Sequence, residues 1–203
     1  QSQGQYSRLC TCGKDGQESL LETDMANIIE QGIAMLGDMY DVFFFSMPKK
    51  EDAKYSEWKI WFERFLPFFE DGAIFVGHSL GGLFLAKYFS ENEYKKVVGG
   101  VFLVAPAYDI PLHPHSDFAI LGPLTKLGEQ IQKVFIYFSK DDQIVPFSNF
   151  ESYTKELPRI EGRVFEDRGH FNIEVFPEIV EDILSLNAGI AEGDIPQFPE
   201  RAG

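Results

Sequence analysis

The chain has 203 residues, and at about 100 to 200 residues per domain this length predicts a single domain, 1–203. Hydrophobic residues make up 44% and charged residues 25% of the sequence, so we expect a packed core and exclude a disordered chain. The formal net charge of −14 repels phosphate backbones and anionic lipid headgroups. This charge argues against nucleic-acid-binding and membrane-surface proteins.

Nothing in the sequence predicts a membrane span or a metal site. The longest apolar stretch, Val97 to Tyr108, is too short to cross a bilayer, and residues 1–5 lack the apolar core of a signal peptide, which is absent or already removed. Cys10 and Cys12 stand too close together for a favourable disulfide, and no further Cys or His cluster has metal-ligand spacing. We therefore expect reduced thiols in a cytoplasmic protein.

Strand-length and helix-length apolar patterns alternate along the chain. The strand-length runs lie at residues 40–45, 73–77, 97–104, 133–138 and 163–165. Helical spacing or length is found at residues 20–36, 53–69, 83–90, 121–131, 148–157 and 175–186. This alternation predicts the fold class α/β, with a mostly parallel central sheet flanked by helices on both faces. Residues 187–203, which contain two prolines, are expected to form a loosely held tail.

The strongest motif is Gly77-His78-Ser79-Leu80-Gly81-Gly82, a G-x-S-x-G sequence between a predicted strand and a predicted helix. In a nucleophile elbow the serine stands on a strained strand-to-helix turn, and the flanking glycines let the backbone segments approach closely. A glycine-rich connection without chemistry is the alternative. A phosphate-binding loop is disfavoured, because the Walker Lys-Ser/Thr is missing and the glycines do not follow G-x-G-x-x-G.

A serine hydroxyl is a weak nucleophile at neutral pH and needs a base, which in turn needs an orienting carboxylate. With a nucleophile elbow, these partners follow the serine in the order Asp or Glu, then His. Of the four histidines, His78 lies within the elbow motif, while His113 and His115 precede the strand predicted at 133–138. His170 is therefore the candidate base, with a plain surface histidine as the alternative.

Two candidate acids, Asp141 and Asp142, follow the strand predicted at 133–138. Catalytic groups in open α/β sheets gather at the carboxyl ends of the strands, where both aspartates would lie. The neighbour of the catalytic acid could cap the turn or bind backbone amides, and plain solvation of both carboxylates is a further alternative.

With these motifs the chain resembles the α/β-hydrolases, and most closely the small retinoblastoma-binding-protein-9-like (YdeN-like) serine hydrolases. The resemblance covers roughly residues 35–186. The matching segments are Gly-His-Ser-Leu-Gly-Gly at 77–82, Leu-Val-Ala-Pro at 103–106, Asp-Asp-Gln-Ile-Val-Pro at 141–146 and Gly-His-Phe at 169–171. The resemblance implies the α/β-hydrolase fold and a catalytic triad. It places the acid at Asp142, four residues before the proline of its segment, and the base at His170.

The N-terminal segment 1–19 departs from this family. Family members begin with a strand and a His-Gly or Pro-Gly loop whose backbone N–H completes the oxyanion hole, and no such loop is evident here. Residues 6–12, followed by Gly13 and Lys14, are the candidate equivalent. We therefore expect the N–H of Leu80 as one oxyanion donor and the N–H of Gly13 or Lys14 as the second.

The sequence thus predicts a serine hydrolase that cleaves small, short-acyl carboxylic esters without a metal or other cofactor. Segment 106–130 has room only for a minimal cap. An apolar acyl pocket is expected from four rings, with ordinary packing an equal alternative for each: Tyr108, Phe118, Phe147 and Phe171. The expected partner is a small-molecule ester, not nucleic acid or a membrane. A lactonase, thioesterase, acyltransferase or small peptidase would use the same triad, and a catalytically weak binding module is the non-enzymatic alternative.

Overall fold

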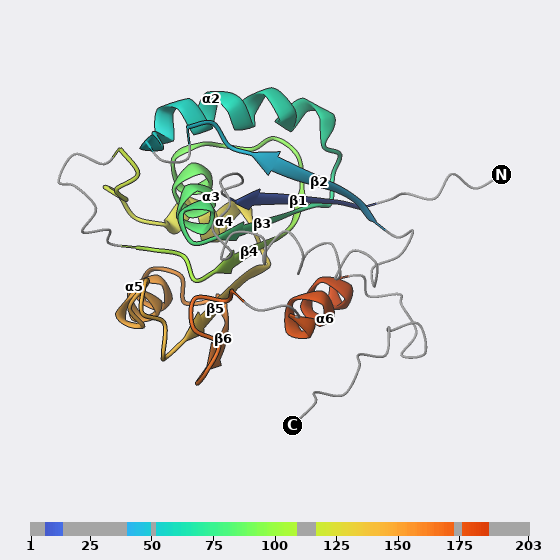
Figure 1. The fold of residues 1–203 in the computed structure, drawn as a ribbon. Helices are drawn as coiled ribbons and strands as arrows, with labels where there is room; N and C mark the ends of the chain where they lie inside the picture. Colours follow the sequence, from blue (N-terminus) through green and yellow to red (C-terminus); the bar gives the residue numbers. More distant parts are fainter. Residues whose placement is uncertain (1–6, 14–39, 50–51, 109–116, 173–175, 187–203) are drawn as a thin grey trace.

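The computed structural model describes residues 7–13, 40–49, 52–108, 117–172 and 176–186 (Figure 1). The predicted helix at 20–36 and the predicted tail at 187–203 lie outside these residues. The strands of the described part are β1 (Ser7–Gly13), β2 (Tyr40–Ser46), β3 (Ala73–His78), β4 (Val98–Val104), β5 (Val134–Ser139) and β6 (Glu161–Phe165). The helices are α2 (Tyr55–Phe65), the 3-10 turn η3 (Leu66–Phe68), α3 (Leu80–Glu91), α4 (Thr125–Gln130), α5 (Ser148–Glu156) and α6 (Pro177–Ser185).

The strands form one parallel sheet in the order β2-β1-β3-β4-β5-β6 (Figure 1). The prediction of a parallel α/β sheet is confirmed. The chain places β2 on one side of β1 and β3 on the other, so the strand order reverses between β1 and β3. In open α/β sheets, ligands bind outside the carboxyl ends of the strands at such a reversal. The elbow motif follows β3 and therefore lies at this position.

The polar N-terminal segment does form the first strand. β1 covers Ser7–Gly13 and lies between β2 and β3, with Cys12 opposite Gly77 and Gly13 opposite Ser46. The expectation of a strand over residues 6–12 is thus confirmed to within one residue at each end. The carboxyl end of β1 reaches the same edge of the sheet as the elbow.

Helices cover both faces of the sheet, as predicted (Figure 1). The apolar run of β4 divides between the two faces, because successive side chains of a strand point in opposite directions. Val101 and Leu103 join the core beneath α2, α3, α4 and α5, whereas Phe102 and Val104 join the core beneath α6. Aromatic rings form a large part of both cores. The largest fully buried side chains include Trp58, Phe62, Phe75, Phe84, Phe89, Phe102, Phe135 and Tyr137.

The segment 106–130, predicted as a possible small cap, is described at residues 106–108 and 117–130, where it belongs to the crossover from β4 to α4 and includes that helix. The helix expected at 121–131 is shorter in the structure, where α4 begins at Thr125, because Gly122 and Pro123 disfavour helix before it. Asp117 accepts hydrogen bonds from the backbone N–H groups of Tyr55 (2.8 Å) and Ser56 (3.1 Å) at the start of α2. Residues 109–116 lie outside the described residues, and the small cap over 106–130 remains a prediction.

Phe118, predicted as a pocket residue, is a core residue in the structure. Its side chain is only 1% exposed. The ring packs edge-on against Trp58 at 5.2 Å and against Tyr55 at 5.9 Å between ring centroids. The packing alternative therefore describes this ring, because the crossover that carries it is folded down onto α2.

Helix α6 is fixed to the sheet by Asp182, which is 5% exposed. Its carboxylate accepts a hydrogen bond from the Tyr137 hydroxyl at 2.7 Å and pairs with the Arg163 guanidinium at 2.6 Å. Burial, together with the Asp182 carboxylate, raises the pKa of Tyr137, so the hydroxyl remains a hydrogen-bond donor. These bonds join β5, β6 and α6 around a buried polar group.

Asp182→Ala is expected to lower the free energy of unfolding by about 1 to 3 kcal/mol, because the buried Tyr137 hydroxyl loses its acceptor. Urea denaturation followed by circular dichroism measures the change. Glu181→Ala, at an exposed position one residue earlier on α6, is the matched control and should stay within about 0.5 kcal/mol of wild type. Equal stability of the two variants would contradict the anchoring role.

Candidate active site

Ser79 stands on a strained turn between β3 and α3. Its backbone has φ +53° and ψ −116°, a conformation that is costly for a residue with a Cβ atom. The N–H of Ser79 donates to the carbonyl of Val104 at 2.8 Å, and its carbonyl accepts from the N–H of Leu83 at 3.1 Å. Among the described residues, Ser79 Oγ has no hydrogen-bond partner, so this half-buried hydroxyl is available to a base or a ligand.

The glycines of the motif are required by close backbone contacts. A Cβ atom on Gly77 would lie 2.5 Å from the carbonyl oxygen of Gly81. On Gly82 it would lie 2.9 Å from Cβ of Pro106 and 3.0 Å from the carbonyl oxygen of Gly77. The start of α3 can therefore cross the end of β3 only where side chains are missing, which is the geometry of a nucleophile elbow.

His170 and Asp142 form a hydrogen-bonded pair, with 2.8 Å between His170 Nδ1 and Asp142 Oδ2. Both side chains are withdrawn from solvent, at 9% exposure for His170 and 0% for Asp142. The other oxygen of Asp142 accepts hydrogen bonds from the backbone N–H groups of Ile144 (2.8 Å) and Val145 (2.9 Å). Because a carboxylate accepts the Nδ1 proton, Nε2 of His170 carries the free lone pair of the neutral imidazole.

His78 links this pair to the elbow. Its Nε2 is hydrogen-bonded to the backbone carbonyl of His170 at 2.8 Å, and the two imidazole rings lie 4.7 Å apart. Nε2 is therefore the protonated nitrogen of His78, because a carbonyl oxygen can only accept. The sequence did not reveal this contact, since it joins residues 92 positions apart. It places His170 directly beside the residue that precedes Ser79.

The two neighbouring aspartates have different partners. Asp141 Oδ1 accepts hydrogen bonds from the Ser139 hydroxyl at 2.5 Å and from the N–H of Gly169 at 2.8 Å. The Ser139 hydroxyl, and then the Gly169 N–H, hold the pKa of Asp141 below its ordinary value. Asp142 thus faces the imidazole ring of His170, and Asp141 binds the backbone beside it. The alternative that the neighbouring carboxylate binds backbone amides describes Asp141.

Two of the predicted pocket rings, Tyr108 and Phe147, are half-buried. The N–H of Tyr108 donates to Asn149 Oδ1 at 2.7 Å, which fixes the chain just after β4. The ring of Phe147 stacks on Phe150 at 5.3 Å between centroids. Both residues lie near the carboxyl ends of β4 and β5, and their contact with a ligand remains a prediction.

Phe171 is fully buried, unlike these two rings. Its backbone has φ +58°, and its ring packs against Phe165 at 5.6 Å and Phe176 at 5.3 Å in the core beneath α6. The bend turns this side chain into the core immediately after His170. The packing alternative therefore describes Phe171 as it describes Phe118.

The backbone positions expected to form an oxyanion hole come from the ends of two elements. Leu80 is the first residue of α3, where N–H groups have no partner within the helix. Gly13 is the last residue of β1, next to Cys12, which pairs with Gly77. Lys14 lies outside the described residues. The donor roles of Leu80 and Gly13 remain predictions.

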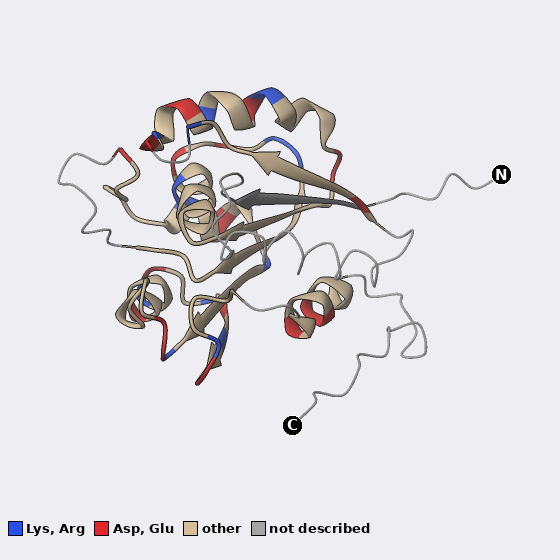
Figure 2. Ribbon diagram, viewed as in Figure 1, with Lys and Arg blue, Asp and Glu red and all other residues tan. Residues whose placement is uncertain are grey.

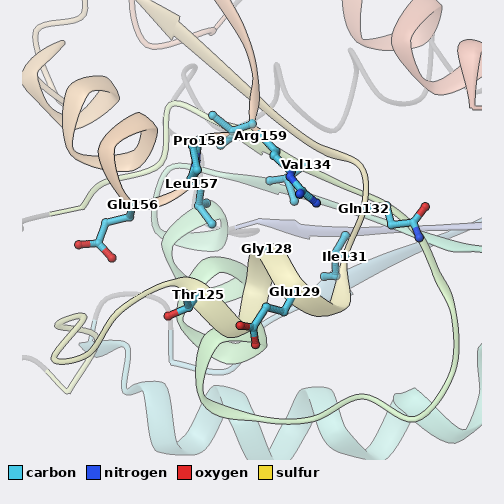
Figure 3. A pocket seen from close by; sticks show the side chains of 11 residues that line it. Thr125, Gly128, Glu129, Ile131, Gln132, Val134, Glu156, Leu157, Pro158 and Arg159 are labelled. Carbon is cyan, nitrogen blue, oxygen red and sulfur yellow. The ribbon is translucent and has the colours of Figure 1, made fainter.

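A cavity of about 620 Å³ lies elsewhere, among residues of α4, the start of β5 and the end of α5 (Figure 3). Val134, which lines it, is the first residue of β5, whereas Asp142 follows the last. The cavity therefore lies at the opposite edge of the sheet from the candidate site. Within the described ranges, no group of three or more His, Cys, Asp or Glu side chains is arranged to hold a metal ion. None of the described helices is long and apolar enough to cross a membrane.

Gly77→Ala is expected to reduce the free energy of unfolding by about 1 to 3 kcal/mol, because its Cβ would overlap the backbone of Gly81. Urea denaturation provides the measurement. Gly122→Ala is the matched control, since a Cβ there meets nothing within 4 Å. Similar stability of the two variants would show that the elbow does not need its first glycine.

Comparison with known proteins identifies the family. A family model described as serine hydrolase matches residues 46–178, more than half of the chain. YdeN of Bacillus subtilis (strain 168) is 27% identical over an alignment of 143 residues, and the match covers 68% of this chain and 73% of YdeN.

Solved structures share the fold. The ydeN gene product of B. subtilis has a TM-score of 0.74 at 19% identity, covering 91% of this chain and 100% of the other. A YdeN-like protein from Pectobacterium atrosepticum has a TM-score of 0.65 at 15% identity, covering 95% and 94%. A carboxylesterase from the thaumarchaeon Nitrososphaera gargenis has a TM-score of 0.66 at 14% identity, covering 93% and 92%. The chain belongs to the serine hydrolase family and has the α/β-hydrolase fold of the YdeN-like proteins.

Proposed function

We propose that the protein is a carboxylic ester hydrolase in which Ser79, His170 and Asp142 form the catalytic triad. The observation that supports this most strongly is the 2.8 Å hydrogen bond between His170 and Asp142, held against the elbow by His78. A strained serine, an imidazole and a buried carboxylate are the three groups that acyl transfer to a serine requires.

The reaction begins when Ser79 Oγ attacks the ester carbonyl carbon while His170 Nε2 takes the hydroxyl proton. The tetrahedral intermediate collapses, the bond to the leaving oxygen breaks, and the imidazolium of His170 protonates the departing alcohol. Water then attacks the acyl group on Ser79, with His170 again acting as the base. Release of the carboxylic acid restores the hydroxyl of Ser79 and the neutral imidazole.

Asp142 keeps His170 in the tautomer that this reaction needs. One carboxylate oxygen accepts the proton of Nδ1, so that Nε2 is free to accept the serine proton. The other oxygen is held by the backbone N–H groups of Ile144 and Val145, which prevents the carboxylate from rotating. These same bonds stabilise its negative charge next to the imidazolium that forms during each transfer.

The oxyanion of the tetrahedral intermediate would bind the N–H of Leu80 and, as the second donor, the N–H of Gly13. Leu80 opens α3, so the positive end of the helix dipole adds to its hydrogen bond. Loss of one such donor lowers turnover by about 10² to 10³ in well-studied hydrolases. The position of β1 beside β3 supports a second donor from this strand.

The proposed substrate is a small, uncharged ester with a short acyl chain. Carboxylesterases with the same fold support ester chemistry. The net charge of −14 disfavours anionic substrates, and Figure 2 shows acidic but no basic residues on α6. Tyr108 and Phe147 are the half-buried rings proposed to contact the acyl chain.

The reaction as proposed uses side chains, backbone N–H groups and water, and calls for no metal or organic cofactor. The proposed partner is the ester itself, with no role for nucleic acid or a membrane. We place the protein in the cytoplasm on the basis of its sequence alone, because Cys10 and Cys12 are poorly spaced for a disulfide.

A fluorophosphonate probe should label wild-type protein, which should also hydrolyse p-nitrophenyl acetate. Ser79→Ala should abolish both reactions, because the probe bonds to the activated serine oxygen. Ser148→Ala, at an exposed position, is the control and should label like wild type. Folded wild type that neither labels nor turns over esters would refute the proposed function.

Lactone and amide substrates run in parallel test the ester preference, and faster amide cleavage would indicate a peptidase.

Asp142→Asn should lower kcat for p-nitrophenyl acetate by about 10³ to 10⁴, because the amide favours the wrong tautomer of His170. Asp141→Asn should have a smaller effect, since its amide oxygen can still accept from Gly169. Steady-state kinetics on both folded variants provides the test. The reverse ranking would assign the orienting carboxylate to Asp141.

A further inference from the structure

The loop that carries His170 has an unusual backbone. Gly169 has φ +52° and Phe171 has φ +58°, so both neighbours of His170 lie in the left-handed region. This conformation is sterically unfavourable for Phe171, because its Cβ atom crowds the backbone there. The N–H of Phe171 donates to the carbonyl of Arg168 at 3.0 Å, which closes a tight turn. A turn of this kind persists only where its surroundings hold it in place.

The first constraint on this turn is Ser139, the last residue of β5, which is 0% exposed. Its hydroxyl donates to Asp141 Oδ1 at 2.5 Å and accepts from the N–H of Arg168 at 2.8 Å. A hydroxyl has a single proton, and the carboxylate can only accept, so the direction of both bonds is fixed. Ser139 thus ties the end of β5 to the start of the turn.

The second constraint is Asp141. The same Oδ1 atom that accepts the proton of Ser139 also accepts the N–H of Gly169 at 2.8 Å. Two successive N–H groups, those of Arg168 and Gly169, are therefore held by two side chains from β5 and the residues after it. Bonds to an ionised acceptor are stronger than those between neutral groups.

We infer that Ser139 and Asp141 are positioning residues that hold the backbone of the His170 loop so that its imidazole reaches both Asp142 and Ser79. We refer to the side chains of Ser139 and Asp141, with the N–H groups of Arg168 and Gly169, as the loop clamp. The inference rests on the proposed function. The loop clamp does not contain the reacting atoms and acts through the peptide groups before His170.

The two adjacent aspartates would then both position His170, each through a different part of the residue or its loop. Asp142 orients the ring of His170, and Asp141 orients the backbone from which that ring projects. A carboxylate that held only the ring would leave the position of Nε2 sensitive to movement of the turn. Misplacement of a catalytic group by about 1 Å can cost about 10²-fold in rate.

Other contacts should keep the loop folded when the loop clamp is removed. The carbonyl of His170 is bonded to His78 at 2.8 Å. The Arg168 guanidinium pairs with Glu178 of α6 at 2.6 Å, and the Arg168 side chain is 10% exposed. These contacts are independent of Ser139 and Asp141. Loss of the loop clamp should therefore change the position of the His170 imidazole more than it changes the free energy of unfolding.

The test compares Asp141→Ala, which removes the acceptor, with Asp141→Asn, which keeps an oxygen in its place. For p-nitrophenyl acetate, Asp141→Ala should lower kcat about 10- to 100-fold with KM within about 2-fold of wild type. Asp141→Asn should recover most of the lost kcat. Asp167→Ala, at an exposed position in the same loop, is the matched control and should behave as wild type.

A double-mutant cycle tests whether the two side chains act as one unit. Ser139→Ala should lower kcat by a factor similar to that of Asp141→Ala. The Ser139→Ala/Asp141→Ala double variant should lose little more than the worse single variant, because each change breaks the same clamp. Full multiplication of the two losses would contradict the loop clamp, as would equal losses in Asp141→Ala and Asp141→Asn.

An NMR measurement separates failure of this inference from failure of the proposed function. The ring ¹H–¹⁵N spectrum of His170 reports its hydrogen bond to Asp142 in the absence of substrate. The spectrum should change in Asp141→Ala and stay close to wild type in Asp141→Asn and Asp167→Ala. An unchanged His170 spectrum in folded Asp141→Ala overturns the loop clamp, whatever the activity. Inactive wild type with the expected spectral changes overturns only the proposed function.

Discussion

The hydrogen bond between His170 Nδ1 and Asp142 Oδ2 depends on the parallel pairing of two strands. Its residues are 28 positions apart, and each follows the carboxyl end of a strand. β5 and β6 pair in parallel, with Ser139 opposite Phe165, so the segments that leave these strands meet at one edge of the sheet. An antiparallel β6 would carry His170 to the opposite edge. The contact between His170 and Asp142 therefore requires the parallel direction of β5 and β6, in addition to the two side chains themselves.

Tight backbone packing brings the serine to the same edge. The turn at Ser79 is strained, and the missing side chains of Gly77 and Gly82 let the first turn of α3 lie on the end of β3 and against Pro106. The strain is balanced by hydrogen bonds of Ser79 to Val104 and Leu83. Rigid elements thus hold Ser79, the candidate nucleophile, while side-chain bonds to a single turn hold His170, the candidate base. We therefore expect the position of His170 to be the more sensitive of the two to substitutions outside the proposed triad.

The aromatic content of the chain serves mainly the two cores. Rings such as Trp58, Phe62 and Phe84 are fully buried between the helices and the sheet. Only Tyr108 and Phe147, among the four rings predicted for a pocket, keep partial exposure. Of the four rings, only these two are therefore proposed to contact a substrate.

The sequence predicted the elements whose signal is local. Apolar patterns located the strands β2 to β6 and most helices, and the motif around Ser79 located the elbow together with its strand and helix. The order of the chain then identified His170 as the candidate base. Only the resemblance to the hydrolase family favoured Asp142 over Asp141 as the candidate acid. The two aspartates differ in what each carboxylate contacts in the folded chain, which the sequence does not show.

Tertiary placement accounts for what the sequence did not show. Phe118 and Phe171 are buried because a crossover and a left-handed bend turn them inward, and ring type alone carries no sign of either. The contact between His78 and His170 joins distant segments. The polar strand β1 was only weakly indicated, because its place in the sheet is set by pairing with β2 and β3, not by an apolar pattern of its own.

The proposed function requires Ser79 to be a nucleophile that is activated by the pair of His170 and Asp142. Intact-protein mass spectrometry of a rapidly quenched reaction with p-nitrophenyl acetate tests it most directly, because it detects the covalent intermediate itself. We expect the mass increase of one acetyl group, located by peptide mapping on Ser79 and lost with Asp142→Asn at the same quench time. An acetyl group on another residue, or ester consumption through a state without any acyl-enzyme, would refute the proposed role of Ser79.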